Sequence, residues 1–410
     1  MYPIVKILHV IPSMDPTQGG LCQALRGIIA GLKDHDVHNE VVSLDNTGNH
    51  FFAADDFTVH ALGKGKGPWS YNKRLLSWFL ANLPYFDVVI IHGLWRYPGY
   101  ALRKALNKMK KDTTGRLLPK LLIMPHGMLD PYFQKAKSRR LKAVRNAIYW
   151  KLVESELFHI ADGLLFTCKA EASLASTTFT PYYPIREFIV GLGVDAPPAY
   201  SDRMKTAFYE RCGRSFDGAP YLLFLSRIDE KKGVDLLIKA YADRLKDAED
   251  KDSTSRDLPK LVIAGPGLDS PYGRKIQRLA AKDNLLERSI IFPGMLLDDA
   301  KWGAFYGCEA FVLPSHQENF GIAVVEALAC GRPVLIADQV NIWREIESAG
   351  AGYVSPNTLE GATRLLSSWE QTDATQRQTL SRNAKAVYKK AFSPQLATHR
   401  LLYAISETLR

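Results

Sequence analysis

Short apolar segments alternate with helical segments along the whole chain, and this alternation restricts the possible folds more than any other feature. In the first half, apolar runs at 6–11, 87–91 and 120–124 are separated by segments with helical spacing of apolar residues. Uninterrupted apolar runs of this length are typical of parallel strands buried on both faces. The same order begins again at 221–225. The pattern therefore predicts an α/β protein with two doubly wound parallel sheets.

Glycine and proline mark the expected domain boundaries. Residues 191–198 read Gly-Leu-Gly-Val-Asp-Ala-Pro-Pro, which is the composition of a linker. A second break, Phe392-Ser393-Pro394, precedes the last helical segment. We therefore expect one domain over 1–192, a second over 193–392, and a C-terminal helix over 393–410. A length of 410 residues suits two or three domains with their own cores.

Composition and charge exclude several classes of protein. The chain is 46% hydrophobic, yet no apolar run reaches the roughly 18 residues of a membrane span. The five cysteines are scattered and form no C-x-x-C pair, which indicates neither a zinc site nor a disulfide framework and favours a reducing, cytoplasmic compartment. The net charge of +10 suits an anionic membrane surface, a phosphorylated substrate or nucleic acid. Nucleic acid ranks last, because no DNA- or RNA-binding motif accompanies the charge.

Two carboxylates flank an expected helix start in the second half. Glu318 stands before Asn319–Gly321, and Glu326 follows eight residues later inside a helix expected over 322–329. Glycine suits the C-terminal cap of this helix and Pro333 cannot continue it. Free N–H groups at a helix start, together with carboxylates, can bind a polyol. The alternative is an ordinary helix with an acidic start and one satisfied interior glutamate.

Other candidate residues follow strands at the edge where parallel sheets bind ligands. In the first half, Gly19–Gly20 opens a helix after the first strand, which can form an anion site but is often only a turn. His92 and His126 end two apolar strands. A single histidine in such a place is more often structural than catalytic.

In the second half, Arg227 and Lys232 follow the strand at 221–225. A forked guanidinium beside an ammonium suits a diphosphate, and the alternative is a charged surface turn. Gly265 and Gly267 follow the strand at 261–264 and allow a ligand to approach the backbone closely.

A basic amphipathic helix is expected over 134–157. Its apolar residues at helical spacing are Leu141, Val144, Ile148 and Leu152, and lysines and arginines surround them. Such a helix can lie on an anionic membrane, and the alternative is a solvated surface helix. Asp250-Lys251-Asp252 has the form of a metal-binding motif, but it lies in a charged segment expected to be an exposed loop over 246–257, so we assign no metal to it.

In their order, these segments resemble those of family 4 (group 1) retaining glycosyltransferases of the GT-B fold. The resemblance covers essentially the whole chain and rests on Gly19–Gly20, His126–Gly127, Gly193–Asp195, Arg227 with Lys232, Gly265–Gly267, and Glu318 with Glu326. The family often has Glu-Gly-Phe-Gly at 318–321, so Asn319 is a departure. The resemblance implies two Rossmann-like domains facing across a cleft, with an acceptor domain first, a nucleotide-sugar donor domain second, and a last helix that crosses back to the first.

The resemblance also implies an activity: a retaining, metal-independent hexosyltransferase that uses a UDP- or GDP-sugar and a saccharide or lipid-linked acceptor in polysaccharide or lipopolysaccharide assembly. It implies no cofactor, and a cytoplasmic location, peripheral on the inner face of the membrane. The catalytic residues implied are His126, Arg227, Lys232 and Glu318. The donor-binding residues implied are Gly19, Gly20, Arg227, Lys232, Gly265, Gly267, Met295, Glu318, Asn319, Phe320, Gly321 and Glu326.

Three other functions stay open on the same architecture: a sugar-nucleotide epimerase, a phosphorylase, and a non-catalytic nucleotide-sugar-binding protein. Glycoside hydrolysis requires two carboxylates on either side of one bond. Glu318 and Glu326 belong to one helix start, two turns apart, so neither is assigned as a nucleophile.

Overall fold

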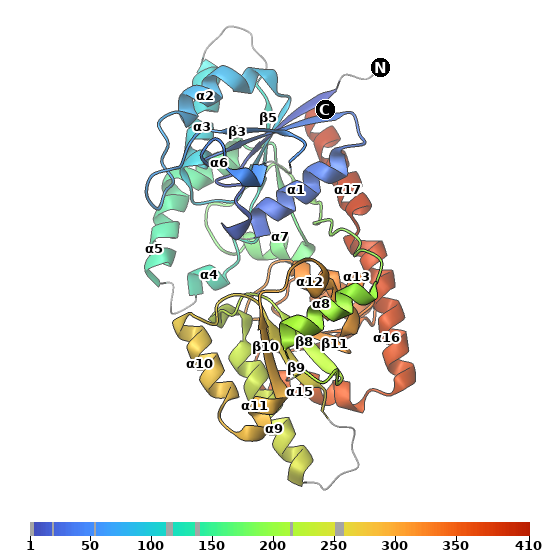
Figure 1. Cartoon of the computed structure of the whole chain (residues 1–410). Helices are drawn as coiled ribbons and strands as arrows, with labels where there is room; N and C mark the ends of the chain where they lie inside the picture. Colours follow the sequence, from blue (N-terminus) through green and yellow to red (C-terminus); the bar gives the residue numbers. More distant parts are fainter. Residues whose placement is uncertain are drawn as a thin grey trace. The chain divides into compact units, whose positions relative to one another are not determined.

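The computed structural model describes residues 4–18, 20–52, 55–111, 118–135, 140–213, 216–250 and 258–410. The chain divides into two compact units (Figure 1), one made of Met1–Gly193 with Pro394–Arg410 and the other of Val194–Ser393. Each division lies one residue from the boundary expected from the sequence. The last helix, α17 (Pro394–Leu409), belongs to the first unit.

The first unit contains a seven-stranded parallel sheet in the order β3-β2-β1-β4-β5-β6-β7. Its central strands are apolar and buried on both faces, as the sequence predicts, and the two edge strands are partly exposed. The strands are β1 (Val5–Val10), β2 (Val37–Ser43), β3 (Thr58–Ala61), β4 (Val88–His92), β5 (Lys120–Met124), β6 (Gly163–Phe166) and β7 (Glu187–Ile189).

Helices cover both faces of this sheet. On one face, α1 (Gly20–Leu32) packs Leu25 and Ile29 into a core cluster with Val41, and α17 contacts α1 beside it. On the other face, a larger cluster joins alternate residues of β1 and β4 to the remaining helices. Those helices are α2 (Leu75–Asn82), α3 (Tyr97–Lys111), α6 (Ser155–Ile160) and α7 (Lys169–Ala175), with a short helix at Leu83–Tyr85. Further short helices lie at Pro16–Gln18 and His50–Phe52, and Phe51 and Phe52 pack against the cluster of α1.

The basic segment expected as one helix over 134–157 has a different form. The structure shows α4 (Tyr132–Lys135), then α5 (Arg140–Tyr149), a π-helical turn (Trp150–Glu154) and α6, while residues 136–139 lie outside the described part. A π turn inserts an extra residue into the helical repeat and shifts which side chains face inward. Trp150 and Glu154 are therefore buried, although the residues of α5 before them are mostly exposed.

The second unit contains a six-stranded parallel sheet in the order β10-β9-β8-β11-β12-β13. Its core is formed by uninterrupted apolar strands, as in the first unit. The strands are β8 (Tyr221–Leu225), β9 (Lys260–Ala264), β10 (Ile290–Gly294), β11 (Ala310–Leu313), β12 (Val334–Ala337) and β13 (Gly352–Ser355).

The helices of the second unit match the sequence only in part. α13 (Ile322–Ala329) has the expected bounds, whereas α8 (Asp202–Cys212), α10 (Pro271–Ala280) and α11 (Asn284–Ser289) were not expected. The expected exposed loop at 246–257 is wrong over 246–250, which belong to α9 (Val234–Asp250), and 251–257 lie outside the described residues. The others are α12 (Asp298–Gly307), α14 (Trp343–Ser348), α15 (Leu359–Gln371) and α16 (Ala374–Val387), with a 3-10 turn at Glu230–Lys232 and a π-helical turn at Tyr388–Phe392.

Candidate functional site

The candidate residues of the second unit gather beyond the carboxyl ends of neighbouring strands. Arg227 follows β8, and Gly265 follows β9 and donates its N–H to the carbonyl of Gly294 at 2.8 Å, at the end of β10. Glu318 lies in the loop after β11, the strand on the other side of β8. This is the edge at which open parallel sheets bind ligands.

Lys232 and Glu318, predicted separately, form an ion pair between Lys232 Nζ and Glu318 Oε2. The exposed fractions of the two side chains are 7% and 18%. Burial by itself raises the pKa of Glu318, but the charges of Lys232 and Lys231 outweigh it and hold the pKa below its usual value. A buried charge needs a partner of this kind, so each side chain stabilises the charged form of the other.

The loop that carries Glu318 is clamped to the loop after β12. Glu318 donates its N–H to the carbonyl of Gln339 at 2.9 Å, and its own carbonyl accepts from the N–H of Asn341 at 2.9 Å. The side chain of Asn341 also donates to Asn319 Oδ1 at 3.3 Å. Gly321 has a φ of +76°, and a Cβ there would lie 3.2 Å from Glu318 Cγ, so glycine suits the turn that leads into α13.

Three of the predicted donor-binding residues, Phe320, Gly265 and Gly267, pack closely against other residues of the second unit. The ring of Phe320 is buried edge-on against Phe392, with centroids 5.7 Å apart. A Cβ at Gly265 would lie 1.9 Å from the Ser226 carbonyl oxygen, and one at Gly267 2.7 Å from the carbonyl oxygen of residue 228. These glycines therefore leave space for the loop after β8, and their assignment to the donor site stays a prediction. Only their backbone groups remain candidates for ligand contact.

Glu326 is the fifth residue of α13, just over one turn from its start, and it pairs with a residue that the sequence analysis did not name. Its Oε1 lies 2.5 Å from the Nζ of Lys301, on α12. Burial raises the pKa of Glu326, and the charge of Lys301 offsets only part of that effect. A polyol would therefore meet a carboxylate that is already held in place by one lysine.

Two further candidates are exposed. The structure shows no hydrogen bond or ion pair between the Arg227 side chain and another described residue, and the guanidinium lies on the surface beyond β8. Met295 is exposed after β10, and its carbonyl accepts from Arg211 Nη2 at 3.0 Å. Both side chains remain accessible to a ligand in solution.

In the first unit, His126 lies in a turn of unusual backbone geometry just after β5. His126 has a φ of +52° and Gly127 one of +77°, and the N–H of Gly127 donates to Glu171 Oε1 at 2.5 Å. The other carboxylate oxygen of Glu171, on α7, accepts from the backbone and hydroxyl of Thr167 at 2.7 and 2.5 Å. Glu171 thus fixes the turn. Its only sequence signal is a carboxylate in the first turn of a helix that follows a strand.

His126 is also one end of a row of hydrogen-bonded side chains. Its Nε2 lies 3.0 Å from His92 Nδ1, His92 Nε2 lies 3.0 Å from His9 Nδ1, and His9 Nε2 lies 3.0 Å from Asn39 Oδ1. Burial lowers the pKa of His9 to about 4 and that of His126 to about 3. Burial and the neighbouring rings hold the pKa of His92 well below its usual value. All three rings are therefore neutral near pH 7.

The remaining candidates of the first unit give less information. Gly20 is the first residue of α1, and Gly19 lies outside the described residues. A buried carboxylate that the sequence analysis missed, Glu154, accepts from the N–H of Trp95 at 2.7 Å in the loop after β4. Burial raises the pKa of Glu154 to about 7.

The described residues include no group of three or more histidine, cysteine, aspartate or glutamate side chains placed to hold a metal ion. Nor does any helix in this described part combine the length and apolarity that a membrane crossing requires.

Comparison with protein families gives a match over most of the second unit. Residues 209–387 match the family model described as glycosyl transferases group 1. This range contains Arg227, Lys232, Glu318 and Glu326, so the charged groups at the sheet edge lie inside the segment that matches the family model.

Curated relatives match over shorter stretches. The D-inositol 3-phosphate glycosyltransferase of Geodermatophilus obscurus is 33% identical over 158 residues, which are 38% of this chain and 33% of that protein. The alpha-monoglucosyldiacylglycerol synthase of Streptococcus pneumoniae is 32% identical over 149 residues, which are 36% and 31% of the two chains. These matches span about a third of the length of the curated relatives.

Solved structures match over the whole chain. HepE of Anabaena, in complex with UDP and glucose, superimposes with a TM-score of 0.70 at 17% identity and covers 98% of this chain and 99% of that one. A glycosyltransferase of Rickettsia africae reaches a TM-score of 0.73 at 16% identity, with 100% of both chains covered. A sucrose-phosphate synthase of Thermosynechococcus elongatus gives 0.68 at 16% identity, with 98% of both chains covered. The two parallel-sheet units therefore have the GT-B fold, as the sequence predicts.

Proposed function

We propose that this chain, whose residues 209–387 match the group 1 glycosyltransferases, is a retaining hexosyltransferase of family 4 that uses a nucleotide-diphosphate sugar and needs no metal or other cofactor. The observation that carries the proposal is the ion pair of Lys232 and Glu318 at the carboxyl edge of the second sheet, inside the matched range. HepE, which has the same fold, was crystallised with UDP and glucose, and this supports a UDP-sugar donor ahead of a GDP-sugar.

The chemical difficulty in such a transfer is the departure of the leaving group. The bond from the anomeric carbon to the diphosphate oxygen breaks, negative charge develops on the diphosphate, and the sugar becomes oxocarbenium-like. We assign the stabilisation of that charge to Arg227, which is exposed, and to Lys232, which Glu318 holds in position. Each charge-assisted hydrogen bond contributes about 1.5–3 kcal/mol. Two protein cations then supply what a divalent ion supplies in metal-dependent transferases.

We assign the remaining roles as the family resemblance implies. Glu318 and the amides of 319–321 orient the transferred sugar, His126 hydrogen-bonds it, and Glu326 accepts from the ribose hydroxyls. The acceptor hydroxyl oxygen bonds to the anomeric carbon on the face that the diphosphate leaves, and its proton passes to the departing phosphate. The configuration is then retained without a protein nucleophile.

The acceptor is proposed to be a saccharide or a lipid-linked saccharide of cell-surface glycan synthesis, bound by the first unit at the cytoplasmic face of the membrane. The support is an exposed apolar row on α5 and the following turn, with arginine and lysine beside it. The exposed fractions are 89% for Leu141, 60% for Val144, 56% for Ile148 and 65% for Leu152. A row of this kind can enter the headgroup region of an anionic bilayer. One curated relative is a glucosyldiacylglycerol synthase, which also supports a lipid acceptor.

The test begins with donor binding. Thermal unfolding is followed with UDP, GDP, ADP and their common sugars, with and without EDTA. A ligand at 100 times its Kd adds about 2.7 kcal/mol to the free energy of unfolding. We expect one nucleotide family to stabilise the protein equally with EDTA, and Arg227→Ala to lose this stabilisation. If stabilisation requires a divalent metal, the metal-independent mechanism is wrong.

Turnover then separates the alternatives. A transferase releases nucleoside diphosphate only when an acceptor is present, whereas an epimerase converts the sugar without one. A phosphorylase would require pyridoxal phosphate and no nucleotide sugar. Binding without turnover on any glycan or lipid acceptor would leave a non-catalytic nucleotide-sugar-binding protein. Loss of about ten- to a hundredfold in kcat for Arg227→Ala, at unchanged folding, is the result expected for a transferase.

A further inference from the structure

We propose that Asn39, His9 and His92 form a relay that sets the tautomer and ring orientation of His126. In this arrangement His126 carries its proton on Nε2 and presents an unprotonated Nδ1 to a hydroxyl of the bound sugar. The part of the proposal that concerns the sugar rests on the proposed function, whereas the relay itself does not.

The strand register places the four side chains in one diagonal row. They lie on four neighbouring strands in the order β2-β1-β4-β5, or just beyond the last of these strands. Residues two apart on a strand point to the same face of the sheet. From each strand to the next, the member of the row lies two residues closer to the carboxyl end of the sheet. His9 is paired with Val41, which is two residues after Asn39 on β2. His92 is two residues after Ile90, the partner of His9, and His126 is two residues after Met124, the partner of His92. The row therefore leads from the buried sheet to its ligand-binding edge.

Hydrogen-bond chemistry gives the row a direction. A neutral imidazole has one N–H donor and one acceptor nitrogen. Because Asn39 Oδ1 can only accept, His9 must carry its proton on Nε2, which leaves His9 Nδ1 to accept from His92 Nε2. By the same step, His92 Nδ1 accepts from His126 Nε2. One amide oxygen at the buried end thus determines which nitrogen of His126 is free at the other end.

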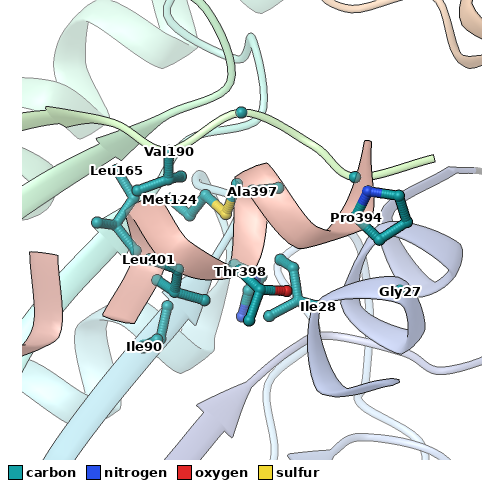
Figure 2. Close-up of a pocket in the computed structure, with 13 residues that line it drawn as sticks. Gly27, Ile28, Ile90, Met124, Leu165, Val190, Pro394, Ala397, Thr398 and Leu401 are labelled. Atoms are coloured by element: carbon teal, nitrogen blue, oxygen red, sulfur yellow. The ribbon is translucent and has the colours of Figure 1, made fainter. Parts of the chain in front are cut away.

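Two helices shield the row from water. His92 lines a small cavity on the face covered by α1 and α17, together with Ile90, Met124, Thr398 and Leu401 (Figure 2). The cavity holds about 20 Å³, which is room for about one water molecule. Both ring nitrogens of His92 are already used within the row, so water has little chance to compete for them. In a site shielded from bulk water in this way, a chain of hydrogen bonds holds one arrangement.

A metal centre and a purely structural cluster both account for the row less well. A metal centre does not fit, because the described residues include no set of three or more ligand side chains placed around one metal ion. The ring nitrogens instead face each other at 3.0 Å, which is a hydrogen-bond distance. A purely structural cluster would need only that its buried polar atoms be paired. The row ends instead at a partly exposed histidine in a turn with φ of +52°, which Glu171 holds in place through Gly127.

The relay is tested by NMR on the full chain labelled with ¹⁵N in the histidine rings, with no nucleotide present. Two-bond proton–nitrogen spectra report which ring nitrogen carries the proton, and the His126→Gln variant assigns the signal. We expect His126 with its proton on Nε2. Finding the proton on Nδ1, or a mixture of the two forms, in the unmodified protein would overturn the proposal, whether or not any variant folds.

The second arm removes the buried end. Asn39→Leu should produce a mixture of His126 tautomers, whereas the matched control Val41→Ala, on the same strand and face, should leave the tautomer unchanged. With a competent donor and acceptor, Asn39→Leu should lower kcat about three- to tenfold with little change in the KM for the donor, because only part of the population has the competent tautomer. An unchanged tautomer in Asn39→Leu contradicts the relay. A protein with the expected tautomers but no transferase activity contradicts only the proposed function.

Discussion

At the scale of single residues, the second unit keeps a carboxylate charged in a place where burial opposes charge. Glu318 remains ionised because Lys232 and Lys231 lower its pKa against the effect of burial. The pair joins residues that are 86 positions apart in the chain. Each partner is therefore costly to remove alone, since the other would remain buried without an opposite charge.

A double-mutant cycle tests this pair. Lys232→Met should destabilise the second unit by up to about 3–5 kcal/mol, because the buried charge of Glu318 then loses its ion-pair partner and keeps only the weaker effect of Lys231. Adding Glu318→Gln, which removes that charge at constant shape, should restore part of the loss. The free energies of unfolding are measured by urea denaturation at pH 7.5. Strictly additive effects of the two substitutions would mean that the side chains do not interact in solution.

Substitution of Gly265 tests how closely the loop after β9 approaches the loop after β8. Gly265→Ala should cost about 3 kcal/mol or more, because the backbone has a φ of +137° and the new Cβ would lie 1.9 Å from the Ser226 carbonyl oxygen. Gly213→Ala is the matched control in the same unit: it has a φ of +75° but no atom within 4 Å of the Cβ position. We expect it to cost only about 1–2 kcal/mol. Equal losses in urea denaturation would show that the backbone angle alone, and not the contact, requires glycine at 265.

At the scale of elements, α5 differs from the other helices of the first unit. Of its ten residues only Asn146 is buried, and the apolar residues Leu141, Val144 and Ile148 face solvent. The π-helical turn that follows restores burial at Trp150, whose ring stacks on Phe179 with centroids 4.9 Å apart. The sequence pattern indicated an amphipathic helix, but only the structure shows that its apolar side is left uncovered by the described residues.

The uncovered side of α5 can be tested with vesicles. Replacing Leu141, Val144 and Ile148 by serine should abolish sedimentation with phosphatidylglycerol vesicles and leave thermal stability nearly unchanged, because exposed substitutions alter stability by about 0.5 kcal/mol or less. Tyr85→Ser with Ile185→Ser is the control, since both residues are exposed apolar positions elsewhere in the same unit. Sedimentation of the triple variant equal to that of the unmodified protein would exclude α5 as the membrane contact.

At the scale of the whole molecule, the two units carry different titratable groups in their interiors. The first unit holds three neutral histidines in one row, of which His9 and His92 are buried, and it also holds Glu154, whose pKa burial raises to about 7. The second unit pairs its buried carboxylates with lysines. The stability of the two units should therefore respond differently to pH.

Acid should weaken the first unit before the second. A histidine with a lowered pKa stays neutral in the folded state, so the unfolded state takes up protons below about pH 6.5 and stability is lost as the pH falls towards 4. Glu154 acts in the opposite direction over pH 7 to 4.5, so the net loss between pH 7.5 and 5.0 is about 2–4 kcal/mol. The contribution of Glu318 is lost only below its usual pKa of 4.5.

Calorimetry at the two pH values measures this difference. The transition of the first unit, identified by its shift in His9→Leu, should move to lower temperature at pH 5.0 more than that of the second unit. Equal shifts of both transitions would show that the three histidines are not held neutral in the folded protein.

Much of the architecture could be predicted from the sequence, because the signals for it are local. Uninterrupted apolar runs predicted the parallel strands, and the glycine and proline around Cys330 predicted the end of α13. The helices α8, α10 and α11 were missed. In α8 only Met204, Phe208 and Cys212 are buried, and Gly303 of α12 leaves space for the Met204 carbonyl. Such a helix is stabilised by packing against its neighbour and has little pattern of its own.

The amino-acid sequence is enough to predict the two parallel sheets, the segments that end at their ligand-binding edges, and the candidate residues on those segments. Which of these residues meet depends on contacts between distant parts of the chain. Lys232 with Glu318, Lys301 with Glu326, and the row from Asn39 to His126 all depend on how distant strands and helices align. The physical reason is the separation along the chain over which each interaction acts. Hydrophobic periodicity and turn chemistry depend on residues that are near neighbours in the sequence. Strand register and ion pairing join residues that are 25 to 86 positions apart.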